Sequence, residues 1–131
     1  SWWNGRPFDR VLLDAPCSAS GVIRRHPDIK HLRRPADLEA LAGLQSELLQ
    51  AGWRVLERGG RLLYVTCSVF RRENDAVVGA FLSRNPDARE NNLLPNNNIH
   101  ALMKRTSHGF QILPGTEDLD GFFYACLDKQ P

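Results

Sequence analysis

The chain has 131 residues, which is the length of one small domain or of part of a larger one. With 42% hydrophobic and 24% charged residues, its composition is that of a globular protein and excludes a disordered or collagen-like chain. The net charge is +2, but residues 1–35 carry seven basic and three acidic side chains, so we expect an anionic partner near the N-terminal third.

The first half of the chain predicts a strand, a helix and a second strand. Phe8–Asp14 is apolar enough for a short buried strand, and a loop punctuated by Pro and Gly follows through residues 15–35. Pro35 is well placed to open a helix, in which leucines recur at three- and four-residue steps to about residue 57. A Gly-Gly pair ends this helix, and Arg61–Thr66 is the second buried strand. This βαβ unit predicts a parallel sheet with helices on both faces.

The rest of the chain predicts a second helix over about residues 72–83, then a loop-like segment at 91–109. Residues 110–113 and 121–127 are apolar, and the turn between them predicts an antiparallel pair at one end of the sheet. We therefore expect an α/β fold with parallel strands, crossover helices and a terminal antiparallel hairpin. A complete doubly wound nucleotide-binding domain opens with a strand, a glycine-rich turn and a helix. None of the ten glycines forms such a turn, so we expect the C-terminal half of a larger domain.

Three cysteines, Cys17, Cys67 and Cys126, lie far apart and include no CxxC pair. This spacing argues against a disulfide framework and a zinc site, so we expect reduced thiols, a cytoplasmic protein and no bound metal. We also expect no membrane association, because no apolar run approaches the roughly 18 residues of a membrane span and the N-terminus has no basic-then-apolar leader.

Two of the cysteines and one acid follow the ends of the two predicted parallel strands. Asp14 ends the first strand shortly before Cys17, and Cys67 comes directly after the second strand. Neighbouring parallel strands lie about 4.8 Å apart and end at the same edge of a sheet, so these side chains would line one crevice. One thiolate could then add to an electrophilic carbon while the other thiol moves a proton and the acid holds the substrate. The alternative is that the cysteines are small buried apolar side chains, as we expect for Cys126, and that Asp14 caps the loop.

The loop after the first cysteine is strongly basic, with five Lys or Arg residues and one Asp between residues 24 and 34. One interpretation is a solvated surface loop, which is the fate of most charge runs. The other is phosphate binding beside a reactive centre, because guanidinium groups bind phosphate through two parallel hydrogen bonds. The candidate RNA-binding side chains are Arg24, Arg25, His26, Lys30, Arg33 and Arg34.

Several motifs make the chain resemble the RNA cytosine-C5 methyltransferases. Residues 14–21, DAPCSASG, are similar to the family motif DAPCSxxG, and residues 66–68 match its TCS motif. Residues 24–30, 113–114 and 120–123 also match in order and spacing. The likeness runs over nearly the whole chain, is weakest across residues 84–109, and fits best the bacterial members of the Sun or Fmu type, which act on small-subunit ribosomal RNA. One departure is the sequence RREN at residues 71–74, where relatives have a more acidic stretch.

The resemblance implies the C-terminal half of a Rossmann-like class I methyltransferase fold, with S-adenosyl-L-methionine as cofactor. It implies that Cys67 is the nucleophile that adds to C6 of a cytosine in small-subunit ribosomal RNA. Cys17 would resolve the adduct after methyl transfer to C5, and Asp14 would touch both the cofactor and the target base. We expect residues 1–131 to form a partial catalytic domain without the N-terminal cofactor-binding half, and to be inactive alone.

Two alternatives stay open at this point. The same chemistry could act on transfer RNA or large-subunit ribosomal RNA, or the chain could be a non-catalytic RNA-binding module with structural thiols. A thiol-redox role is disfavoured by the absence of a CxxC pair. The resemblance also implies the sheet order 3-2-1-4-5-7-6, of which residues 8–127 would supply strands 4, 5, 7 and 6. The last strand along the chain would then lie between the second and third, and strand 8–14 would be an exposed hydrophobic edge through which we expect self-association.

Overall fold

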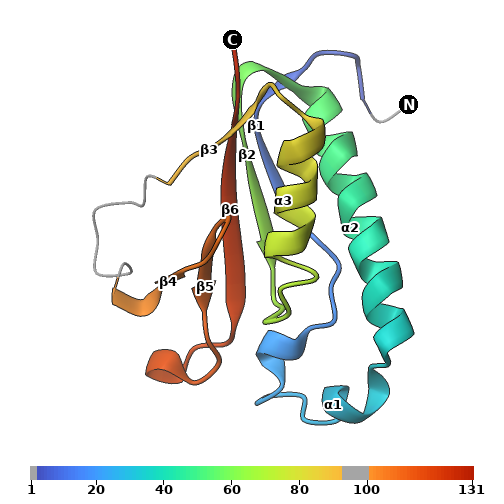
Figure 1. Cartoon of the computed structure of the whole chain (residues 1–131), viewed down its shortest axis with the longest axis vertical. Coiled ribbons are helices and arrows are strands. Elements are labelled where there is room, and N and C mark those ends of the chain that lie inside the picture. Colours follow the sequence, from blue (N-terminus) through green and yellow to red (C-terminus); the bar gives the residue numbers. More distant parts are fainter. Residues whose placement is uncertain (1–2, 93–100) are drawn as a thin grey trace.

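The computed structural model describes residues 3–92 and 101–131, whose six strands form one sheet in the order β1-β2-β6-β5-β4, with β3 also paired to β6 (Figure 1). The strands are β1 (Phe8–Asp14), β2 (Leu56–Thr66), β3 (Ala88–Glu90), β4 (Lys104–Arg105), β5 (Phe110–Ile112) and β6 (Phe122–Lys129). The helices are α1 (Ile29–Leu32), α2 (Pro35–Val55) and α3 (Asp75–Arg84), with 3-10 turns at Ser20–Val22 and Thr116–Asp118.

The predicted βαβ unit is present. β1 lies parallel to β2, with Leu12 opposite Leu63, and α2 connects the two strands. Pro35 begins α2, where its lack of an N–H leaves no hydrogen bond unmade. The carboxylate of Asp37 accepts the backbone N–H of Arg34 at 2.9 Å, which caps the first turn of the helix.

β2 is longer than the sequence predicts. It begins at Leu56, directly after α2, so the Gly-Gly pair lies inside the strand and not at the end of the helix. Gly59 has a φ of +78°, which glycine adopts without strain. The register of the β1–β2 pairing shifts at this irregular stretch. Phe8 pairs with Leu56 before it, and Arg10 pairs with Arg61 after it. The apolar periodicity thus predicted the course of α2 but not that β2 would begin directly at its end.

The two late strands pair antiparallel toward one end of the sheet, as predicted, and β4 extends that end. β6 lies between β2 and β5, and it is antiparallel to both. β3 and β4 were not predicted, because strands of two or three residues show no periodicity. β4 falls in the predicted loop 91–109, of which residues 93–100 lie outside the described residues.

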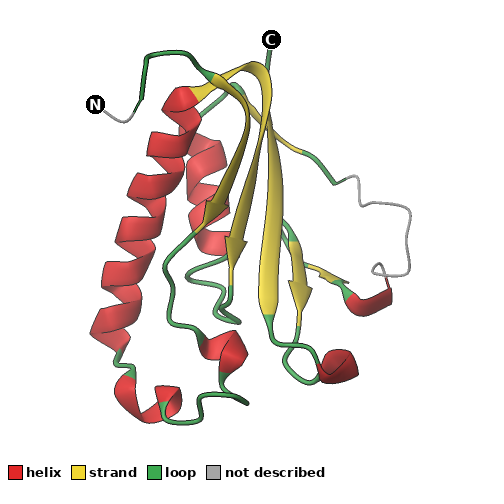
Figure 2. Ribbon diagram, turned by 180° about the vertical axis from the view of Figure 1, so that it is seen from behind, coloured by secondary structure: helices red, strands yellow, loops and turns green. Residues whose placement is uncertain are grey.

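Both long helices pack on the same face of the sheet (Figures 1 and 2). The core between them and the sheet contains Leu49, Trp53, Phe81, Tyr64 and Phe123, all nearly inaccessible to solvent. We expected helices on both faces, but in the part of the chain that the structure describes neither long helix covers the other face. None of the described helices has the length and apolarity needed to cross a membrane.

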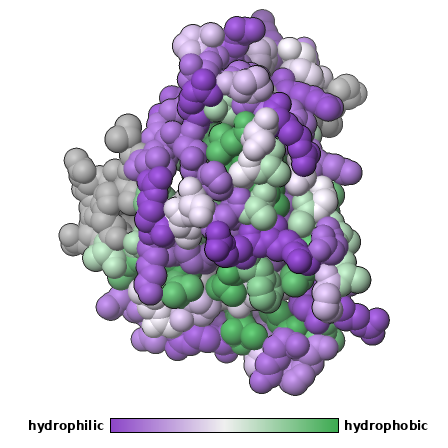
Figure 3. Space-filling view, in the orientation of Figure 1, coloured by the Kyte–Doolittle hydropathy of each residue, from purple (hydrophilic) through white to green (hydrophobic). Residues whose placement is uncertain are grey.

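The other face of the sheet carries half-exposed apolar side chains. Leu12, Leu63 and Cys126 are cross-strand neighbours there, because alternate residues of a strand point to opposite faces. Leu12 is 68% exposed on the edge strand β1. Cys126 is only half-buried, whereas we expected it in the core. Burial raises the pKa of the Cys126 thiol. Figure 3 shows the molecule in the orientation of Figure 1; this side is mostly hydrophilic, with apolar patches in its upper centre and across its lower half.

We predict that the chain self-associates through β1, which pairs with β2 on one side and with no described strand on the other. An edge strand with exposed apolar side chains templates pairing with another chain. Leu12→Lys places a charge on this edge and should shift the chain to monomer at concentrations where the parent forms larger species. Leu32→Lys is the matched control, since Leu32 is 65% exposed in α1 and outside the sheet. Light scattering across a concentration series measures the mass; a parent chain that stays monomeric throughout contradicts the prediction.

Candidate active site

The two cysteines that follow β1 and β2 meet at one edge of the sheet. Cys17 Sγ and Cys67 Sγ lie 3.2 Å apart, although 50 residues separate them in sequence. Both thiols are free and half-buried. The contact depends on the parallel pairing of β1 and β2, because that pairing brings the end of each strand to the lower edge in Figure 1.

The thiol of Cys67 has a lower pKa than an ordinary cysteine. The hydrogen bond from Cys17 lowers the pKa of the Cys67 thiol to about 7, although burial and the nearby charges of Asp14 and Glu73 act in the opposite direction. The same hydrogen bond, together with burial, raises the pKa of Cys17 well above its ordinary value. At pH 7 about half of the Cys67 thiol is therefore ionised, and the proton of the pair that remains is on Cys17. A partly exposed thiolate at this pH is a good nucleophile.

Asp14 ends β1 at the same edge. Its side chain is exposed, and its charge raises the pKa of Cys67, so the carboxylate lies within electrostatic reach of the thiol. The next residue continues the sheet ladder, because the backbone N–H of Ala15 donates to the carbonyl of Val65 at 2.9 Å. The structure thus brings together all three residues that the sequence singled out as a candidate catalytic group.

A buried glutamate joins the two cysteine loops, and the sequence did not point to it. Glu73 is fully buried, and its carboxylate accepts the backbone N–H of Ser18 at 2.8 Å and the Ser18 hydroxyl at 2.6 Å. It also accepts a hydrogen bond from the Ser68 hydroxyl and one from the Gln45 amide at 3.1 Å. Ser18 follows Cys17 and Ser68 follows Cys67, so one carboxylate fixes both loops relative to each other. The signal that could have revealed it is the serine after each cysteine, since buried hydroxyls need an acceptor.

Two glycines close the loop behind the sulfurs. The backbone N–H of Gly21 donates to the Cys67 carbonyl at 2.8 Å, and the Gly21 carbonyl accepts the N–H of Gly121 at 2.7 Å. A Cβ on Gly21 would lie 2.2 Å from the Gly121 carbonyl oxygen, so no other residue fits there without moving the backbone. This close approach explains in physical terms why a glycine ends the DAPCSASG segment.

The basic loop is only partly available to a ligand. Arg24 pairs with Asp118 at 3.3 Å and Arg25 with Asp120 at 3.1 Å, while Arg33 donates to the Ser18 carbonyl at 3.0 Å. These three arginines therefore hold the loop against the rest of the protein.

All six candidates are exposed, and the remaining three, His26, Lys30 and Arg34, form no ion pair among the described residues. Lys30, Arg33 and Arg34 line a hollow of about 300 Å³ whose other walls include Ile29 and Phe70. Cations around an apolar and aromatic floor suit an unstacked base and its phosphate. Among the described residues, no cluster of His, Cys, Asp and Glu could hold a metal ion.

The lowered pKa of Cys67 predicts how fast it reacts with iodoacetamide as pH changes. In a Cys126→Ser background, alkylation of the Cys67 peptide should rise with a midpoint near pH 7, because only the thiolate reacts. Cys17→Ala removes the donor that stabilises the thiolate, and the midpoint should move up toward the ordinary thiol value of about 8.5. Peptide mass spectrometry follows the reaction, and an unchanged midpoint in Cys17→Ala would show that the sulfur–sulfur hydrogen bond does not control Cys67.

The buried glutamate predicts a large loss of stability. Glu73→Ala leaves the Ser18 and Gln45 donors without their acceptor, which should lower the free energy of unfolding by about 3 kcal/mol. Glu39→Ala removes a carboxylate whose side chain is 65% exposed and paired with Arg72, and should cost less than about 1 kcal/mol. Urea denaturation compares the two variants; equal losses would contradict the role assigned to Glu73.

Comparisons with known proteins agree with this geometry. The family described as "16S rRNA methyltransferase RsmB/F" matches residues 1–128. Ribosomal RNA small subunit methyltransferase B of Vibrio cholerae is 56% identical over 129 residues, which are 98% of this chain and 27% of that protein. The protein of the same name from Pseudomonas putida is 55% identical over 129 residues, 98% of this chain and 28% of that protein. The chain thus spans just over a quarter of the length of these relatives.

Solved structures share the fold. A methyltransferase homologue from Pyrococcus horikoshii has a TM-score of 0.75 and 29% identity, and the match covers 95% of this chain and 40% of that one. NSun6 from Pyrococcus horikoshii, solved with SFG, has a TM-score of 0.76 and 28% identity, and the match covers 97% of this chain and 31% of that one. The sheet is thus that of a Rossmann-like methyltransferase. With a matching family model over nearly its whole length, this chain belongs to the 16S rRNA methyltransferase RsmB/F family.

Proposed function

We propose that the full-length protein carrying this chain transfers a methyl group from S-adenosyl-L-methionine to C5 of a cytosine in small-subunit ribosomal RNA, in the cytoplasm. The observation that carries the proposal is the 3.2 Å contact between Cys17 Sγ and Cys67 Sγ, in which Cys67 has the lowered pKa. Membership of the family supports the RNA substrate, and the neighbour solved with SFG, an analogue of S-adenosyl-L-methionine, supports the cofactor.

Cys67 begins the reaction as the nucleophile. Its thiolate forms a bond to C6 of cytosine, and the electron pair of the C5–C6 double bond moves to C5, which becomes nucleophilic. The cofactor, when bound, supplies the methyl group that C5 takes up. Near pH 7 a large share of Cys67 is already ionised, so no separate base is needed to activate it.

Cys17 completes the reaction as the base. The main cause of its raised pKa is the hydrogen bond to Cys67, and that cause disappears once the Cys67 sulfur is bonded to carbon. Cys17 can then release its proton to solvent and, as a thiolate, take the proton from C5. The electron pair of the C5–H bond re-forms the C5–C6 double bond, and the S–C6 bond breaks so that Cys67 leaves as a thiolate. The two thiols thus exchange roles because each one's pKa depends on the state of the other.

Asp14 and the basic loop are proposed to hold the substrates. The exposed carboxylate of Asp14 could accept the exocyclic amino group of cytosine, a pairing that carboxylates make with this base, and it would also face the cofactor. His26, Lys30 and Arg34 would contact RNA phosphates directly, while Arg24, Arg25 and Arg33 shape the loop through their internal partners. We also propose that the cofactor is bound mainly by a part of the full-length protein that these 131 residues do not include.

The proposal predicts opposite outcomes for the two cysteines in a full-length family member carrying this sequence. Cys67→Ala should abolish both methyl transfer and the covalent protein–RNA adduct, whereas Cys17→Ala should accumulate an adduct that survives denaturing electrophoresis. The assay is run near pH 9, above the ordinary thiol pKa of about 8.5, so that Cys67 is ionised even without Cys17.

Cys126→Ala is the matched control for loss of a thiol. Cys126 is half-buried in β6 and takes no part in the sulfur–sulfur contact, so its variant should methylate RNA at the parent rate. If Cys67→Ala and Cys17→Ala also methylate at the parent rate, the catalytic assignment is wrong.

A further inference from the structure

The segment that follows Cys67 separates two hollows. Phe70 lines the hollow beside Lys30 and Arg34, described above, whereas Val69 and Arg71 line a different groove of about 550 Å³. The opposite wall of this groove is formed by residues 105–107 and 111. A third hollow, of about 400 Å³, shares Arg71 with this groove and extends it along the first turn of α3. We call the two together the Arg71 groove.

The Arg71 groove presents positive charge. Arg71 and Arg105 are exposed, and neither forms an ion pair with a carboxylate among the described residues. Arg71 has only a 3.4 Å contact with the Ser107 hydroxyl, and the Arg105 guanidinium lies 5.3 Å from the centre of the Phe110 ring. Both guanidinium groups thus keep donors free for an anion.

Asp75, the acid among the described residues that line the groove, accepts hydrogen bonds from the protein itself. Asp75 is 7% exposed, and its Oδ1 accepts the Thr106 hydroxyl and the backbone N–H of His108, each at 2.8 Å. Its charge is therefore shared with internal donors and offers little competition to an anion held by the two arginines.

The floor of the groove is attached to the candidate active site. The side-chain amides of Asn74 and Gln111 donate to the Ser68 carbonyl at 2.9 and 3.3 Å, and Ser68 is the residue after Cys67. Asn74 also donates to Gln111 at 3.2 Å, so the two amides and the cysteine loop form one network. A ligand in the groove would therefore lie at a fixed position relative to the nucleophile.

We propose that the Arg71 groove binds the phosphates of the RNA strand on one side of the target cytosine. This inference rests on the proposed function. A base that is pulled out of its strand for reaction leaves a phosphate backbone running away from the site in two directions. The hollow beside Lys30 and Arg34 serves one direction, and the Arg71 groove serves the other. Paired guanidinium groups suit phosphates because each donates two parallel hydrogen bonds.

The test measures RNA binding by a full-length family member carrying this sequence. The probe is a short fluorescent single-stranded oligoribonucleotide with one central cytosine. The double variant Arg71→Gln and Arg105→Gln should raise the Kd about tenfold. It should also reduce the slope of log affinity against log salt by about 1.4, which corresponds to the loss of two phosphate contacts on a single strand. Lysine at both positions keeps the charges and should restore most of the affinity and the slope.

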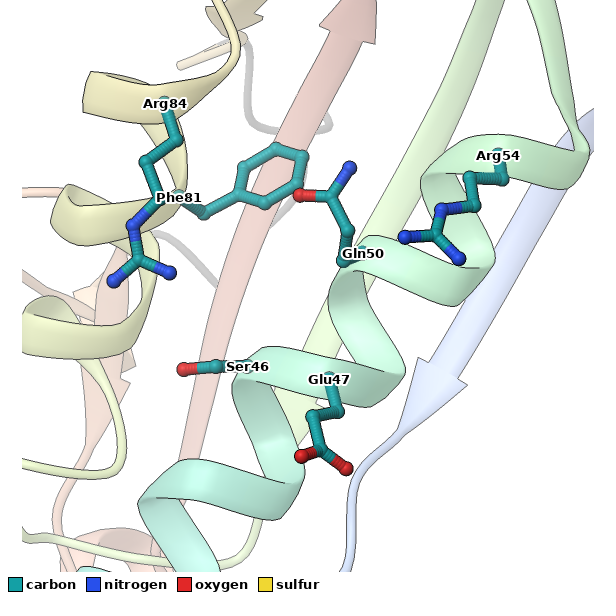
Figure 4. A pocket seen from close by; sticks show the side chains of 6 residues that line it. All are labelled: Ser46, Glu47, Gln50, Arg54, Phe81 and Arg84. Atoms are coloured by element: carbon teal, nitrogen blue, oxygen red, sulfur yellow. The ribbon is translucent and has the colours of Figure 1, made fainter.

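The matched control removes two arginines elsewhere. Arg54 and Arg84 line a pocket of about 330 Å³ between α2 and α3, with Glu47 and Phe81 in its walls (Figure 4). They lie near the C-terminal ends of α2 and α3, and both helices run away from the lower ends of β1 and β2 (Figure 1). Arg54→Gln with Arg84→Gln changes the net charge equally and should leave both Kd and salt slope unchanged.

Shortening the probe on one side at a time gives a second readout. Removal of the flank that occupies the groove should weaken binding to the parent protein and have no further effect on the Arg71/Arg105 double variant. Unchanged binding by that variant, or equal losses in the control variant, overturns the inference. If the parent protein neither binds the probe nor forms a Cys67 adduct, the proposed function is wrong. If the adduct forms but the double variant binds RNA like the parent, only the role proposed for the Arg71 groove is wrong.

Discussion

A hydrogen bond between two thiols joins the ends of β1 and β2, and the chemistry of the site depends on it. The contact lowers the pKa of Cys67 to about 7 and raises that of Cys17, so when the pair ionises near neutral pH the negative charge is on Cys67 and Cys17 is the donor. Without this contact both residues would be ordinary half-buried thiols, mostly protonated at pH 7. In the proposed reaction the same contact changes the base strength of Cys17 once Cys67 has reacted, so a single interaction serves both halves of the cycle.

The rest of the site keeps two loops at this distance. Parallel pairing of β1 with β2 sets the distance between the strand ends, and the buried Glu73 carboxylate ties Ser18 to Ser68 beyond them. The backbone contact of Gly21 with Gly121 then closes the loop from the other side. Burying a carboxylate costs free energy unless its oxygens accept hydrogen bonds. The carboxylate of Glu73 accepts four, from donors in three segments of the chain.

Sequence reasoning reached the parts of this structure that depend on local pattern. The apolar spacing of α2 and the apolar runs of β1 and β2 predicted the βαβ unit, and from it the meeting of Cys17 with Cys67. The family resemblance implied that β6 lies between β2 and β5, as the structure has it. Local pattern alone does not give this position, because strand order depends on which long-range pairing buries most apolar surface. Glu73 was missed for the same reason, since its four donors come together only in the fold. The basic loop shows the limit most clearly: six candidates look alike in sequence, yet Arg24 and Arg25 are paired with acids nearly 95 residues away.

The most direct test of the account identifies which sulfur bonds to the base. RNA containing 5-fluorocytosine traps the adduct after methyl transfer, because fluorine at C5 cannot be removed as a proton. A full-length family member carrying this sequence is incubated with this RNA and the cofactor, digested, and analysed by peptide mass spectrometry. The account predicts a nucleotide attached to the peptide that contains Cys67 and an unmodified Cys17 peptide. Attachment at Cys17, or no covalent species from an enzyme that methylates unmodified RNA, would contradict it.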